Sequence, residues 1–131
     1  MGFLSVIVAA LAAFFVGAVW YGVFSKPWKE ASGVELGADD KPVNAGNPMT
    51  YVTALIFTIL VAGMMRHIFA LSGIDTVDKG LVSGLGIGLF LIAPWMGIHY
   101  TFSVKPMKLL VIDGGYAAVG CAVMGAVLTL F

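Results

Sequence analysis

The feature that most constrains this chain is a set of four long apolar runs. A helix needs about 20 residues to cross the hydrocarbon core of a bilayer, and each run reaches that length. None of them alternates between polar and apolar residues, as the strands of a membrane barrel do. Since backbone groups inside a bilayer must find hydrogen-bond partners within the protein, the sequence predicts four transmembrane helices, over residues 3–24, 49–71, 78–102 and 108–131.

Composition supports this interpretation. Of the 131 residues, 60% are hydrophobic and only 11% are charged, whereas about 25% are charged in an ordinary soluble domain. We therefore expect one all-α transmembrane domain over residues 1–131, an integral membrane four-helix bundle with up-and-down topology. Seven basic and seven acidic residues cancel, so no nucleic-acid partner is indicated. No basic residue precedes the first run, which favours a retained span over a cleaved signal peptide.

The first connection, residues 25–48, carries seven of the fourteen charged residues. Pro27 suits the first position of a short helix and Gly33 suits its end, so we expect a short interfacial helix on the membrane surface. Residues 37–46 are rich in glycine, aspartate, asparagine and proline and predict an irregular loop. Asn47 and Pro48 then form a typical start for the second transmembrane helix.

Lysine placement predicts the orientation. Basic residues near transmembrane helices stay on the cytoplasmic side. Arg66 and Lys79 flank one side of the membrane, and five lysines flank the other: Lys26, Lys29, Lys41, Lys105 and Lys108. We therefore expect a multi-pass protein of the cell inner membrane with both termini outside.

A glycine ridge marks the third run. Gly80, Gly84 and Gly88 recur at four-residue spacing, which lets another helix approach closely. Either the bundle itself or an oligomer packs there, and we expect self-association through this ridge. Pro94, further along the same run, should kink the helix because it lacks a backbone N–H.

The turn between the third and fourth runs is short, so these helices must be antiparallel neighbours. His99 precedes the turn and Asp113 follows it, at similar depth. A charged aspartate within a span costs about 2.5 to 3.5 kcal/mol at the bilayer centre, so Asp113 should face inward and have a partner. His99, Tyr100 or Lys108 could be this partner. We expect a candidate pocket at this end of the bundle, lined by Trp20, Tyr21, Tyr51, Trp95, His99, Tyr100, Asp113 and Tyr116.

Two interpretations of this pocket remain open. A His99–Asp113 pair among aromatic rings could carry protons or bind a cation. Alternatively, Asp113 accepts hydrogen bonds that hold the helical hairpin together, and the aromatic residues mark the headgroup level. The two histidines and Cys121 lack metal-ligand spacing, and no cofactor-binding fingerprint is present.

Four short motifs resemble those of a known family of small four-span bacterial membrane proteins, classed as domain of unknown function 1761. They are Gly17-Ala-Val-Trp20-Tyr21, Lys26-Pro27-Trp28, Lys105-Pro106-Met-Lys108-Leu109 and Asp113-Gly-Gly115-Tyr116. The resemblance covers essentially the whole chain. It implies the four-span fold and supplies no reaction.

Two classes of function follow from the sequence. The first is a binding or accessory protein that packs as an oligomer or within a larger membrane complex. The alternative is a minimal transporter or channel that uses the intramembrane His99–Asp113 pair. An enzyme is less favoured because no catalytic set is recognisable.

Overall fold

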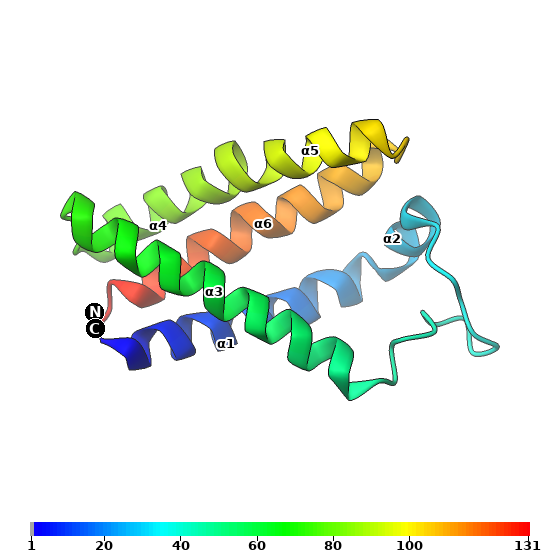
Figure 1. The fold of residues 1–131 in the computed structure, drawn as a ribbon, viewed down its shortest axis with the longest axis horizontal. Helices are drawn as coiled ribbons and strands as arrows, with labels where there is room; N and C mark the ends of the chain where they lie inside the picture. Colours follow the sequence, from blue (N-terminus) through cyan, green and yellow to red (C-terminus); the bar gives the residue numbers. More distant parts are fainter. Residues whose placement is uncertain (1) are drawn as a thin grey trace.

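A computed structural model describes residues 2–131 as an antiparallel arrangement of four long helices, with both chain ends at the same end of the molecule (Figure 1). The predicted all-α, up-and-down architecture is confirmed. Each of these four helices is sufficiently long and apolar to cross a membrane. The elements are α1 (Phe3–Val23), α2 (Ser25–Ser32), α3 (Pro48–Ser72), α4 (Val77–Ile87), η1 (Gly88–Ile92), α5 (Ala93–Phe102) and α6 (Met107–Leu128).

The helix ends follow local chemistry. The Asn47 side chain caps α3 by accepting a hydrogen bond from the Met49 backbone N–H at 3.0 Å, and Pro48 occupies the first helical position, as predicted. Gly33 ends α2 with a left-handed φ of 66°, a conformation that glycine adopts without steric cost. However, α2 begins at Ser25, two residues before the expected start, because only Phe24 separates it from α1.

The third span consists of α4, η1 and α5 in direct succession. Its central turn, η1, is a π-helix, in which the Ala93 backbone N–H bonds to the Gly88 carbonyl five residues earlier. This wide turn ends just before Pro94, whose missing N–H interrupts ordinary α-helical bonding. The irregularity predicted at Pro94 therefore takes the form of a π-helical turn on its N-terminal side.

The helix α6 is central to the packing. It contacts α1 on one side and α4, η1 and α5 on the other, while α3 packs mainly against α1. The buried core lies toward the end that carries both termini, where α1, α3 and α6 converge. Its members are Val6, Ala9, Ala10, Ala13, Ala62, Met65, Phe69, Cys121, Met124 and Leu128.

The glycine ridge of α4 and η1 lies against α6. A Cβ atom placed on Gly84 would be 2.1 Å from the Cys121 carbonyl oxygen, and one on Gly88 would be 2.2 Å from the Ala117 carbonyl oxygen. A Cβ atom on Gly80 would likewise lie 2.3 Å from the Gly125 carbonyl oxygen. The ridge is thus buried within the bundle, which confirms the first of the two alternatives that the sequence left open. It is not exposed for the self-association that we expected there.

Candidate functional site

Asp113 joins three helices. Its Oδ1 atom accepts a hydrogen bond from the Tyr21 hydroxyl of α1, and its Oδ2 atom accepts one from the Tyr100 hydroxyl of α5, both at 2.6 Å. The half-buried carboxylate of α6 therefore points into the bundle, toward partners on both neighbouring helices. Tyr100 is one of the partners that the sequence suggested.

His99 takes no part in this arrangement. Its side chain is exposed, and its ring packs edge-on against Trp95, with 5.9 Å between ring centroids. Among residues 2–131, no ion pair joins His99 to Asp113. Consecutive helical residues point about 100° apart, so His99 cannot share the inward direction of Tyr100. The predicted His99–Asp113 pair is wrong, and Trp95, which is 65% exposed, also lies outside the site.

Two aromatic side chains fasten α1 to α6. The Trp20 indole Nε1–H donates to the Ile112 carbonyl at 3.0 Å. In the opposite direction, the Tyr116 hydroxyl of α6 donates to the Ala13 carbonyl of α1 at 2.7 Å. Both bonds connect positions about 90 to 100 residues apart in sequence, so they fix how the first and last helices pack.

Each of these aromatic rings lies against a glycine of the opposite helix. A Cβ atom on Gly17 would lie 2.7 Å from the Tyr116 hydroxyl oxygen, and one on Gly115 would lie 2.8 Å from Trp20 Cζ2. Each of the two helices therefore places a glycine where an aromatic ring of the other helix packs. The first and last of the four motifs therefore pack against each other.

Tyr21 is also part of an aromatic cluster. Its ring meets the ring of Tyr116 at a centroid distance of 5.4 Å and the ring of Trp28, on α2, at 5.9 Å, both in edge-to-face geometry. Such contacts hold a ring in one orientation. The Tyr21 hydroxyl is consequently aimed at Asp113 by packing as well as by its hydrogen bond.

A cleft of about 780 Å³ lies beside this cluster, between α3 and the surface formed by α1, α5 and α6. Most of its lining is apolar, and Asp113 lies in its wall. Several of its residues were not singled out from the sequence, because an apolar residue on a transmembrane helix gives no sign of which face it occupies. They include Phe14, Ala54, Phe57, Ile92 and Met96.

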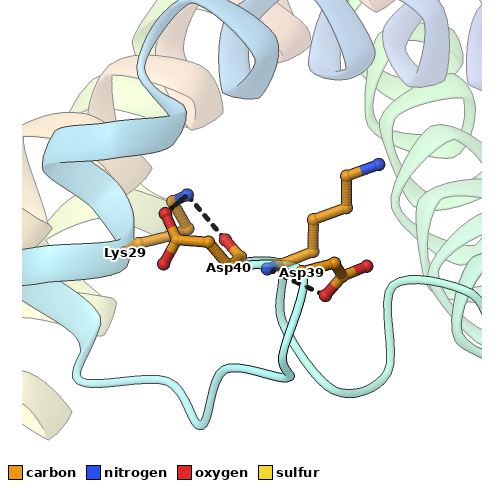
Figure 2. Close-up of polar contacts among 4 residues, drawn as sticks. Lys29, Asp39 and Asp40 are labelled. Atoms are coloured by element: carbon orange, nitrogen blue, oxygen red, sulfur yellow. Dashed lines mark hydrogen bonds and ion pairs between the residues drawn. The ribbon is translucent and has the colours of Figure 1, made fainter.

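One end of the cleft is lined by α2 and the first connection. Lys29 donates a hydrogen bond to the Asp40 backbone carbonyl at 2.8 Å, and its ammonium group lies 3.4 Å from the Asp40 carboxylate (Figure 2). The Asp39 carboxylate accepts a hydrogen bond from the Lys41 backbone N–H. Tyr51 lines this region too, with its hydroxyl donating to the Ala45 carbonyl at 2.6 Å rather than to Asp113. These contacts hold the loop near α2 and the start of α3.

Within the described part of the chain, no three His, Cys, Asp or Glu side chains lie close enough together to hold a metal ion. Asp113 is the single carboxylate in the cleft lining. The chemistry available there is hydrogen bonding and charge recognition in apolar surroundings.

Comparison with curated proteins and with solved structures gave no match. A family model, by contrast, matches residues 4–129, which is nearly the whole chain and includes all four motifs identified in the sequence. The four-helix fold and the resemblance noted from those motifs agree with this match. The chain therefore belongs to the family described as Protein of unknown function (DUF1761).

Proposed function

We propose that the protein is a membrane-embedded binding protein that takes an apolar molecule into the cleft between α3 and the surface of α1, α5 and α6. The cleft itself is the observation that supports this function. Its volume of about 780 Å³ falls within the 300 to 1,000 Å³ typical of ligand pockets, which are mostly apolar with a few converging polar groups. Asp113, Tyr21 and Tyr100 are such groups.

The arrangement of the helices supports access from the bilayer. Helix α3 packs mainly on α1 and makes no extensive contact with α4 or α5, so the bundle is not closed between α3 and α5. An apolar molecule dissolved in the membrane can reach the cleft along this open flank.

A filling substitution tests the proposal. Ala54 lines the cleft from α3, whereas Val52, two residues earlier, is 45% exposed and lies outside the lining. In lipid nanodiscs, Ala54→Trp should weaken binding of an uncharged naphthalene probe at least tenfold, and Val52→Trp should leave it unchanged. Equal binding by both variants and the unaltered protein would contradict the proposal.

A second candidate is an accessory role, in which a helix of a second copy or of a larger membrane complex lies along the open flank between α3 and α5. The lack of extensive contact between these helices favours it. Here Ala54→Trp should change the mass of the assembly extracted in mild detergent, whereas a ligand-binding monomer should keep its mass.

The orientation proposed from the lysines completes this picture. We propose that α2 and the following loop face the cytoplasm and that both termini lie outside the inner membrane, because five of the seven basic residues flank the α2 end. The end of the cleft that α2 and the first connection line would then face the cytoplasm.

A further inference from the structure

The two charged side chains that line the cleft differ in whether they form an ion pair. They belong to Lys29 and Asp113. Lys29 lies at the end that α2 and the first connection line, where it pairs with Asp40. Lys29–Asp40 and Lys108–Glu30 form ion pairs among residues 2–131, and neither pair includes Asp113.

The hydrogen bonds of Asp113 suit an ionised carboxylate. Each of its two oxygens accepts one tyrosine hydroxyl, and a carboxylate oxygen has room for a further donor. Hydrogen bonds donated to the charged form stabilise it. Charged groups within membrane spans commonly pair with another charged group, and neither the Lys29–Asp40 nor the Lys108–Glu30 ion pair involves Asp113.

The neighbouring rings add a second attraction for a cation. Tyr21, which donates to Asp113, is flanked by the rings of Tyr116 and Trp28, and all three residues line the cleft. Aromatic faces attract ammonium groups, most strongly where water is excluded. A bare metal ion would need several oxygen ligands, whereas an organic cation needs one carboxylate, aromatic contacts and apolar space.

We infer that the molecule bound in the cleft is an organic cation, with an apolar body and a positively charged nitrogen that lies against the Asp113 carboxylate and the ring of Tyr21. This inference rests on the binding function proposed above and names the class of its ligand. The two tyrosine hydroxyls position the carboxylate for this contact.

Two matched probes test it. One is naphthylmethyl-trimethylammonium, and the other is its uncharged analogue with a tert-butyl group in place of the trimethylammonium group. Binding is measured in nanodiscs of zwitterionic lipid, for the unaltered protein and for Asp113→Asn. A matched control is Asp78→Asn, which changes an exposed carboxylate at the opposite end of the bundle.

The unaltered protein should bind the cationic probe at least tenfold more tightly than the uncharged one. Asp113→Asn should remove this preference while still binding the uncharged probe, and Asp78→Asn should retain it. Equal affinities for the two probes in the unaltered protein would overturn the inference and leave the apolar cleft in place. If neither probe binds, the proposed function fails together with the inference. The first comparison uses no variant, so it does not depend on whether Asp113→Asn folds.

Discussion

Replacing Gly84 by alanine should strongly destabilise the packing of α4 against α6. The added Cβ atom would lie 2.1 Å from the Cys121 carbonyl oxygen and 2.9 Å from the carbonyl carbon. Ordinary contact begins near 3.4 Å, so the two helices would have to separate by roughly 1 Å in an interior that is otherwise close-packed. Overpacking costs about 1 to 3 kcal/mol, and we expect the upper end because a backbone carbonyl cannot rotate away.

Gly86 provides the matched control. It lies on the same helix, but a Cβ atom there meets nothing within 4 Å, so Gly86→Ala should be neutral or stabilising by up to about 1 kcal/mol through helix propensity. The free energy of unfolding is measured for both variants by titrating the purified protein from mild detergent into dodecyl sulfate and following helical circular dichroism. Equal stability of the two variants would refute the packing shown here, because it would mean that α6 does not lie against Gly84.

Two further predictions concern the site and the orientation. Tyr100→Phe removes one hydroxyl from the Asp113 carboxylate and should lower the free energy of unfolding by about 2 kcal/mol. The control Tyr51→Phe loses an exposed hydrogen bond and should change the free energy of unfolding by less than about 0.5 kcal/mol. The same titration compares the two variants, and equal effects would argue against the Asp113 network. In cells carrying a Cys121→Ala background, a membrane-impermeant maleimide added outside should label a cysteine introduced at Gly2 and miss one at Asp40. The reverse pattern would show that the proposed orientation is inverted.

Much of the fold could be predicted because it depends on local properties of the chain. The length of the apolar runs located the four long helices to within a few residues at most ends. Asn47, Pro48 and Gly33 marked helix ends because capping and left-handed turns depend on the residues in the turn itself. The inward direction of Asp113 followed from the cost of exposing a charge to lipid.

Which residue pairs with Asp113 could not be predicted in the same way. Depth along the helices was estimated correctly, and depth alone admits both His99 and Tyr100. The choice between them depends on the rotation of α5 about its axis, which is set by how the third span packs on α6. That span includes the π-helical turn Gly88–Ile92, and a turn with an extra residue shifts the direction of every side chain that follows it.

The sequence by itself determined the class of the protein, the number of long helices, their antiparallel order and the need for an inward-facing Asp113, since these follow from apolar length, short connections and the energetics of a bilayer. Only the tertiary structure decided that the glycine ridge serves contact between α4 and α6, that Tyr21 and Tyr100 rather than His99 hold the carboxylate, and that α3 leaves a cleft beside it. The physical reason is that every helix of a membrane bundle is apolar over most of its surface. Hydrophobic periodicity therefore does not indicate which face meets a neighbour, and close packing between backbones selects it.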